Sequence, residues 1–251
     1  TFENTIVALE KSGRMLGRVA RVFFALTGSN TTDRLDDINT EISPKLTAHG
    51  DSITLNPELF ARVKTVYDNR AAMTMTREDA KLLEDTYKGM VHAGALLTEA
   101  QRERVKAINS ELSTVTTEFS QLARAAMNDN PVFFNSREDL AGLSDSDIQA
   151  AADLAAENGQ PGKFAIALQN TTQQPLLPSM ENRAAREKLF MASYHRADGR
   201  MDVDTRMLIA KIATLRAQKA ALFGEADWAS YAMWDRMAEK PATALGFMEQ
   251  M

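Results

Sequence analysis

The side chains that most often carry catalysis or bind metals are scarce in this sequence. Its 251 residues include no Cys and three His, namely His49, His92 and His195. The lack of Cys excludes disulfides, thiolate metal sites, iron–sulfur clusters and Cys nucleophiles. No two His are close in sequence and no His-Glu-x-x-His motif is present, so no helix offers a pair of metal ligands on one face. Each His is interpreted as a surface or structural residue rather than as a ligand or general base.

Two glycine-containing loops resemble ligand-binding motifs, but both have the wrong spacing. Residues 159–163 read Gly-Gln-Pro-Gly-Lys, and Phe164 stands where a phosphate loop has the hydroxyl that binds magnesium. The segment also precedes a predicted strand, which favours a plain turn. Residues 198–204 do not follow the calcium-loop order, in which acidic residues precede the glycine. We expect a loop there, with Asp202 or Asp204 capping the next helix.

The remaining candidate clusters also have structural interpretations. Trp228, Tyr231 and Trp234 recur every three residues on one predicted helix, which is typical of core packing more often than of a ligand platform. The acidic residues of 33–37 lie in the first turns of a predicted helix, where negative charge complements the helix dipole. A Gly-x-Ser-x-Gly motif is absent. The residues therefore predict no catalytic, cofactor-binding or metal site within this chain.

The charge and hydropathy patterns exclude two classes of partner. With 29 Lys and Arg against 34 Asp and Glu, the net charge is −5, whereas a protein that binds phosphate backbones needs clustered positive charge. The longest apolar stretch, Val19–Leu26, contains Arg21 and is far shorter than the roughly 20 residues of a membrane-spanning helix. No signal peptide is recognised. We expect neither nucleic acid nor membrane as a partner.

The elements that would position any functional side chain are predicted to be mostly helices. Only 12 Gly and 7 Pro are present, and Ala, the best helix former, is abundant. A stripe from Ile6 to Phe23 predicts one helix that ends near Gly28. Further helix starts are predicted at Thr31 or Thr32, at Asn56-Pro57, at Thr76 with Asp79, and at Thr98 with Gln101.

The longest predicted helix follows Thr98 and runs to Asn128, which is roughly 46 Å at 1.5 Å per residue. Its apolar residues alternate spacings of three and four, a pattern that packs against another long helix. These residues are Val105, Ile108, Leu112, Val115, Phe119 and Leu122, and the five from Ile108 onward are expected to be buried as one seam.

A small β element interrupts the helices in the middle of the chain. Residues 131–134 are expected to be extended, and residues 163–169 alternate apolar and smaller or polar side chains, which predicts a half-buried strand. Ser144 with Asp147 starts a short helix between these segments. We therefore predict an all-α, multi-helical fold with one small β element around residues 131–170. The expected sub-regions are 1–129 (helical), 130–177 (mixed) and 178–251 (helical, with helices at 178–197, 204–223 and 226–239 and another starting at Pro241).

The sequence resembles, in collinear order, the bacterial peptidyl-dipeptidases of the thimet-oligopeptidase-like family of zinc metallopeptidases. The opening Phe2-Glu3-Asn4-Thr5-Ile6 and Ser29-Asn30-Thr31 are more similar to the peptidyl-dipeptidase branch than to the oligopeptidase branch. Departures occur around residues 202–204, 223–225 and 173–175. The other segments that carry the resemblance are residues 9–13, 22–23, 104–112, 119–120, 140–143, 186–189, 194–196, 215–220 and 237–241.

The resemblance implies a catalytic apparatus that this chain does not contain. In the family, a His-Glu-x-x-His helix and a downstream Glu bind one zinc, and the Glu of the motif is the general base. In the family's order these residues come after residue 251. The resemblance implies that the chain is the amino-terminal wall of a deep, narrow channel that admits short peptides, with zinc bound elsewhere in the full-length protein.

Two functional hypotheses follow. In the first, the chain is the amino-terminal part of a metal-dependent peptidase that releases dipeptides from the carboxyl ends of short peptides, and its partner is its own carboxy-terminal catalytic region. In the second, it is a helical interaction module that binds a partner helix or peptide. Thr1 in place of Met, and a last helix with no capping signal, favour a fragment, which is expected to be inactive alone. A cytoplasmic location is inferred from the family and the lack of Cys.

Overall fold

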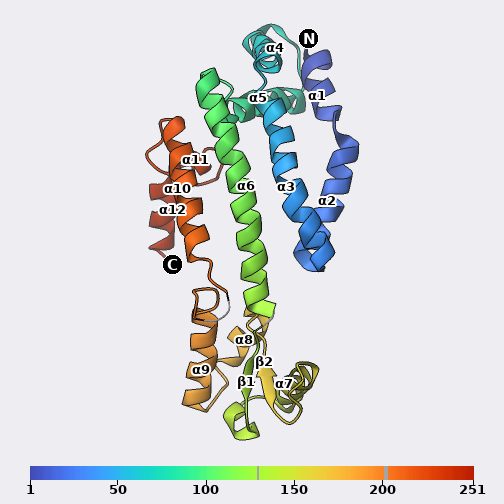
Figure 1. The fold of residues 1–251 in the computed structure, drawn as a ribbon. Coiled ribbons are helices and arrows are strands. Elements are labelled where there is room, and N and C mark those ends of the chain that lie inside the picture. Colours follow the sequence, from blue (N-terminus) through green and yellow to red (C-terminus); the bar gives the residue numbers. More distant parts are fainter. Residues whose placement is uncertain (129, 201–202) are drawn as a thin grey trace. The chain divides into compact units, whose positions relative to one another are not determined.

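The computed structural model describes residues 1–128, 130–200 and 203–251 of the chain (Figure 1). Helices dominate, and the sheet found in these ranges has two short strands. This confirms the predicted all-α class with one small β element. The chain divides into two compact units, of which the first comprises residues 1–117 and 212–251 and the second residues 118–211. The three sub-regions expected from the sequence remain a prediction.

The first unit consists of helices whose starts follow the capping signals. Thr32 accepts a hydrogen bond from the backbone N–H of Leu35 at 3.3 Å, and Asn56 accepts one from Leu59 at 2.9 Å. Both predicted starts are thus confirmed. The elements of this unit are a π-helical turn (Glu3–Val7), α1 (Ala8–Lys11), α2 (Arg14–Ser29), α3 (Asp33–Thr54), α4 (Pro57–Asp68), a 3-10 turn (Arg70–Ala72), α5 (Arg77–Ala93), residues 99–117 of α6 (Glu99–Asn128), residues 212–222 of α10 (Arg206–Leu222), α11 (Trp228–Ala232) and α12 (Pro241–Met248).

Reciprocal capping boxes start α5 and α6. Thr76 and Asp79 bond each other's backbone N–H groups at the start of α5. At the start of α6, the N–H of Thr98 donates to the Gln101 side chain at 3.0 Å, and the N–H of Gln101 donates to the Thr98 hydroxyl at 3.4 Å. Each box satisfies two N–H groups that a helix start leaves without a partner. The predicted length of α6, up to Asn128, is confirmed.

Two helix predictions in this unit are wrong. The helix expected from Ile6 to near Gly28 is interrupted, because Gly13 has a φ of +65° between α1 and α2. This left-handed conformation is accessible to glycine at little cost and ends a helix. The helix expected over residues 226–239 is limited to α11, and the chain leaves it at Met233. Glu239 has a φ of +56°. Lys240, which directly precedes Pro241, is extended, the conformation that a following proline favours.

The core of the first unit gathers around α4 and α5. Tyr67 and Tyr87 stack with ring centroids 3.9 Å apart at its edge. The buried apolar cluster consists of Ile6, Phe60, Val63, Val66, Leu83, Met90 and Ala95.

The predicted apolar seam of α6 is buried at its start alone. Val105 and Ile108 are buried. The other seam residues are half-buried, namely Leu112, Val115, Phe119 and Leu122. The three–four spacing does place these side chains on one helix face, but burial also needs a neighbouring element that covers that face along its whole length. The predicted single buried seam is therefore wrong beyond Ile108.

The second unit packs short helices on a two-stranded antiparallel sheet. Val132, Phe133 and Phe134 pair with Ile166, Ala165 and Phe164 respectively. Fully buried residues of its core include Leu140, Leu168 and Leu189. Its elements are residues 118–128 of α6, β1 (Val132–Phe134), a 3-10 turn (Arg137–Leu140), α7 (Asp145–Glu157), β2 (Phe164–Ile166), α8 (Asn170–Leu176), α9 (Arg183–Tyr194) and residues 206–211 of α10.

A close approach of two backbone segments holds the turn after the 3-10 helix. The N–H of Glu181 donates to the carbonyl of Ala141 at 2.8 Å. Gly142 has a φ of +93°, and a Cβ atom placed on it would lie 2.0 Å from the carbonyl oxygen of Ser179. Both the conformation and the space therefore require glycine at position 142.

Candidate functional site

The three His lie in different surroundings, and the structure does not gather them into a site. His49 is exposed on α3, His92 packs among aromatic rings, and His195 pairs with a carboxylate. Among the residues that the structure describes, no three His, Asp or Glu side chains come together as a group that could hold a metal ion. The described side chains therefore offer no ligand set that fits zinc.

His92 belongs to an aromatic cluster of the first unit. Its ring stacks on Tyr231 and Trp234, with centroid distances of 4.2 and 4.6 Å, and its backbone carbonyl accepts a hydrogen bond from the Tyr231 hydroxyl at 3.1 Å. Burial, and to a smaller extent the positive charge of Lys219, lower the pKa of His92. The structural interpretation of His92 remains a prediction, which these contacts support. The core interpretation holds for Tyr231, which is buried, and is wrong for Trp234, which is 41% exposed.

A charged network next to this cluster was not predicted from the sequence. The Asn109 amide nitrogen donates to both carboxylate oxygens of Asp51, at 2.8 and 3.0 Å. The Lys219 ammonium donates to the amide oxygen of Asn109 at 2.7 Å. Because the three residues come from α3, α6 and α10, the network links three helices of the first unit.

Burial governs the electrostatics of this network. It raises the pKa of Asp51 against the opposing effects of the Asn109 hydrogen bond and the Lys219 charge, and it lowers the pKa of Lys219. The neighbouring Tyr231 has its pKa raised to about 12 by burial and by the charge of Asp51. The result is a pair of opposite charges connected by a neutral amide. This arrangement holds α3, α6 and α10 in position relative to one another. A sequence signal existed, because Asn109 and Lys219 both lie in segments that carry the family resemblance.

The loop that follows α9 is closed by short-range polar contacts. His195 Nδ1 and Asp198 Oδ2 lie 2.8 Å apart. Asp204 accepts a hydrogen bond from the backbone N–H of Arg206, at the first residue of α10. Hydrogen bonds from the side chain and the backbone of Arg206 lower the pKa of Asp204 to about 2. The predicted capping role is thus confirmed for Asp204, whereas Asp202 lies outside the described residues.

The glycine-containing loop at residues 159–163 is a turn, as predicted. Gly159 and Gly162 both have positive φ angles, and the N–H of Lys163 donates to the carbonyl of Gln160 at 3.2 Å. The chain then enters β2 rather than a helix. A phosphate loop instead follows a strand and leads into a helix.

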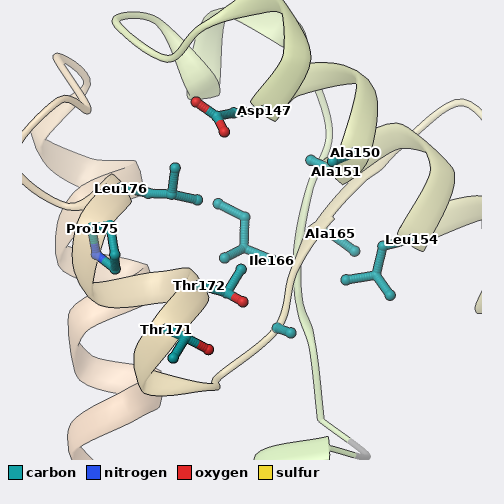
Figure 2. A pocket seen from close by; sticks show the side chains of 11 residues that line it. Asp147, Ala150, Ala151, Leu154, Ala165, Ile166, Thr171, Thr172, Pro175 and Leu176 are labelled. Atoms are coloured by element: carbon teal, nitrogen blue, oxygen red, sulfur yellow. The ribbon is translucent and has the colours of Figure 1, made fainter.

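A cavity of about 350 Å³ lies within the second unit, between α7, β2 and α8 (Figure 2). In Figure 2 the side chains of Ala165 and Ile166 leave β2 on opposite sides, toward α7 and α8 respectively. Asp147 is the charged residue of the lining, and its carboxylate accepts a hydrogen bond from the Ser144 hydroxyl at 2.6 Å. The lining residues are Asp147, Ala150, Ala151, Leu154, Ala165, Ile166, Ala167, Thr171, Thr172, Pro175 and Leu176.

Two helices expose apolar faces to solvent. On α2, Met15, Val19, Val22 and Leu26 form one exposed stripe, and on α12 the exposed side chains include Phe247. Exposed apolar patches of this kind mark interaction surfaces more often than single scattered side chains do. Within the described part of the chain, no helix combines the length and the apolar character needed to cross a bilayer.

Comparison with known proteins agrees with the resemblance predicted from the sequence. Residues 176–251 match the family model of Peptidase family M3. The chain is 41% identical over 250 residues to the dipeptidyl carboxypeptidase of Escherichia coli and 38% identical over 247 residues to that of Salmonella typhimurium. It is 24% identical over 257 residues to oligopeptidase A of Haemophilus influenzae.

These matches cover all or nearly all of this chain but only part of each relative. The chain spans 37%, 36% and 37% of the length of the three proteins, respectively. The identity is higher to the two dipeptidyl carboxypeptidases than to the oligopeptidase, which agrees with the branch that the opening segment indicated. The match to the family model and the similarity along the whole chain together relate this protein to the peptidases of family M3.

Proposed function

We propose that this chain is the amino-terminal, channel-wall portion of a metal-dependent peptidyl-dipeptidase that releases dipeptides from the carboxyl ends of short peptides. The observation that carries the proposal is the 41% identity to a bacterial dipeptidyl carboxypeptidase along the entire chain. Lower identity to the oligopeptidases, 24% in the example from Haemophilus influenzae, makes an oligopeptidase the second choice. Because the relatives are peptidases, an interaction module without enzymatic activity is not favoured.

The proposed partner within the same protein is a carboxy-terminal catalytic region that binds the zinc. Exposed apolar side chains on α12 and just after it support this proposal, because burial of such a surface under another part of the protein is favourable. These side chains are Leu245, Phe247, Met248 and Met251. When bound in that region, zinc would make hydroxide available near neutral pH. The part of this chain would be to form the wall that admits short, unstructured peptides, and the proposed location is the cytoplasm.

The test uses the full-length protein and one peptide in two forms. A short peptide with a free carboxylate and its carboxyl-amidated twin are incubated with the protein, with and without a chelator. We expect dipeptide release from the free peptide, a strong loss of release on amidation because a charged contact is lost, and no release in chelator. Equal cleavage of both forms at internal bonds would indicate an oligopeptidase, and the lack of any chelator-sensitive cleavage would contradict the proposal.

A further inference from the structure

The free edge of β2 forms part of the floor of the cavity in the second unit. The carbonyl of Phe133 accepts a hydrogen bond from Lys188 at 2.6 Å, and the N–H of Asn135 donates to Asp139 at 3.2 Å. Both groups are thus bonded outside the strand pair, and no backbone hydrogen bond joins residues 131 and 167 or residues 135 and 163. Given the register, we therefore assign Val132–Ile166 and Phe134–Phe164 as the hydrogen-bonded pairs. The alternation of an antiparallel ladder then turns the N–H and C=O of Ala165 away from β1, to the free edge.

These backbone groups have no partner among the described residues. Neither Ala165 nor Ala167 takes part in a backbone hydrogen bond outside the strand pair, and no side chain of the described part of the chain bonds their backbone. Ala165 is almost completely buried, yet both residues line the cavity. Buried backbone groups are nearly always paired with protein, water or ligand. The floor of the cavity is therefore suited to a ligand that has peptide groups of its own.

The walls of the cavity determine which side chains and what length of ligand it can accept. Leu154 on α7 and Leu176 on α8 are apolar and half-buried, so they favour alternate side chains of an extended peptide added beside β2. The volume of about 350 Å³ is at the small end of the range of roughly 300–1,000 Å³ that ligand pockets span. A ligand of a few residues fits this volume, and a long segment or a second copy of the chain does not.

The charge of the lining sets the direction of the peptide. Asp147 and Thr171 lie toward opposite ends of the cavity in Figure 2. The negative charge of Asp147 favours an ammonium group at its end, while the hydroxyls of Thr171 and Thr172 at the other end can donate to a carboxylate. From these observations we infer that the cavity binds a short, extended peptide with a free amino end beside β2. The choice of a dipeptide as the ligand rests on the proposed function, since dipeptides are the products that the proposed reaction releases.

The test is a titration of the 251-residue chain with the dipeptide Ala-Leu and with N-acetyl-Ala-Leu, followed by calorimetry and by the amide signals of Ala165 and Ala167 in NMR spectra. We expect saturable binding of Ala-Leu, with shifts concentrated on β2, α7 and α8. Acetylation is expected to weaken binding at least about tenfold, which corresponds to one hydrogen bond between charged groups. The full-length protein is titrated in the same way, with the same expectation.

Three variants make the test specific. Asp147→Asn is expected to weaken the binding of Ala-Leu about tenfold and to leave that of N-acetyl-Ala-Leu unchanged. Asp153→Asn, an exposed position on the same helix, is the matched control and should bind like the wild type. Ala150→Phe places a bulky side chain at an exposed position of the lining and should abolish the binding of both ligands while the melting temperature stays the same.

Several outcomes would overturn the inference. They are the absence of saturable binding up to millimolar Ala-Leu, equal binding of the acetylated dipeptide, and unchanged binding by Asp147→Asn. Because the titration needs no catalysis, its failure is distinguishable from failure of the proposed function. Dipeptide release by the full-length protein without binding here would reject the cavity alone, and binding without dipeptide release would reject the peptidase alone.

Discussion

Asp51 and Lys219 are joined through the two ends of one amide, that of Asn109. The amide nitrogen bonds the carboxylate at 2.8 and 3.0 Å, and the amide oxygen bonds the ammonium at 2.7 Å. An amide is one of the few groups that can satisfy an anion and a cation at once, because it has donors at one end and an acceptor at the other. The stability of this part of the first unit should therefore depend strongly on Asn109.

Replacement of Asn109 by Leu keeps a similar volume and removes both hydrogen bonds. We expect a loss of about 2–3 kcal/mol in the free energy of unfolding, because a carboxylate and an ammonium, both on half-buried residues, lose the amide that bonds them. Urea denaturation followed by circular dichroism measures it. Asn30→Ala, at an exposed position, is the control and should change stability by less than about 0.5 kcal/mol. Equal effects of the two changes would contradict a stabilising role of the network.

The pKa of His92 is expected to make stability depend on pH. Burial and the Lys219 charge lower it in the folded state, below the ordinary value of 6.5. As the pH falls through 6.5, the unfolded chain binds a proton first, so the free energy of unfolding decreases until the folded pKa is passed. His92→Phe keeps a stacking ring and cannot bind this proton. We expect the stability of the variant relative to the wild type to increase between pH 7.5 and pH 5, measured by urea denaturation at both pH values. A constant difference would show that the pKa of His92 is not lowered.

Neighbouring positions on α9 should differ sharply in their sensitivity to truncation. Leu189 is fully buried in the core of the second unit, whereas Phe190 is 52% exposed. Leu189→Ala should cost about 2–5 kcal/mol, since it leaves a cavity in a close-packed core. Phe190→Ala removes a larger side chain and should cost less than about 1 kcal/mol. Thermal melts of both variants check this expectation. A larger loss of stability for Phe190→Ala than for Leu189→Ala would contradict it.

Along α6, the cost of a buried charge should decrease from the start of the helix to its middle. Ile108 is 1% exposed, and Leu112 is half-buried. Ile108→Asp should cost more than about 3 kcal/mol, because an unpaired carboxylate would lie in the core. For Leu112→Asp we expect about 1–2 kcal/mol, since the carboxylate can reach solvent. Chemical denaturation of both variants tests the order, and an equal cost would show that the seam is buried throughout.

The 251-residue chain alone is expected to bind no stoichiometric zinc and to hydrolyse no peptide. A hydrolytic zinc site needs about three protein ligands and an open position, and the described side chains form no such group. Elemental analysis of the purified chain, together with a peptidase assay in the presence and absence of chelator, measures both properties. One zinc per chain with chelator-sensitive hydrolysis would overturn this expectation and would place a catalytic site in the chain itself.

The parts of the fold that follow from local interactions could be predicted from the sequence. The capping boxes at Thr76 and Thr98 fix helix starts through bonds between residues three apart, and the alternation in residues 163–169 predicts a strand. The break at Gly13 was not predicted, because the apolar stripe continues across it. Burial along α6 was not predicted either, since spacing identifies a face and not the element that covers it.

The polar network and the cavity depend on contacts that the sequence does not display. Asp51 and Asn109 are 58 positions apart, and Asn109 and Lys219 are 110 apart. No local spacing pairs them, although Asn109 and Lys219 lie in segments that carry the family resemblance. The free edge of β2 was identified from two bonds made by its partner strand and the residue after it. Lys188 donates to the carbonyl of Phe133, and the N–H of Asn135 donates to Asp139. Such features require the structure.

The close approach at Gly142 makes this position intolerant of any side chain. A saturation mutagenesis library should lose nearly every variant at position 142, including alanine, because a side chain would collide with the carbonyl of Ser179. Gly159 and Gly162 also have positive φ angles, but a Cβ atom would meet nothing within 4 Å at either position. Asn and Asp, which visit left-handed conformations more readily than other residues do, should survive there, so the library would separate glycines kept for space from glycines kept for conformation.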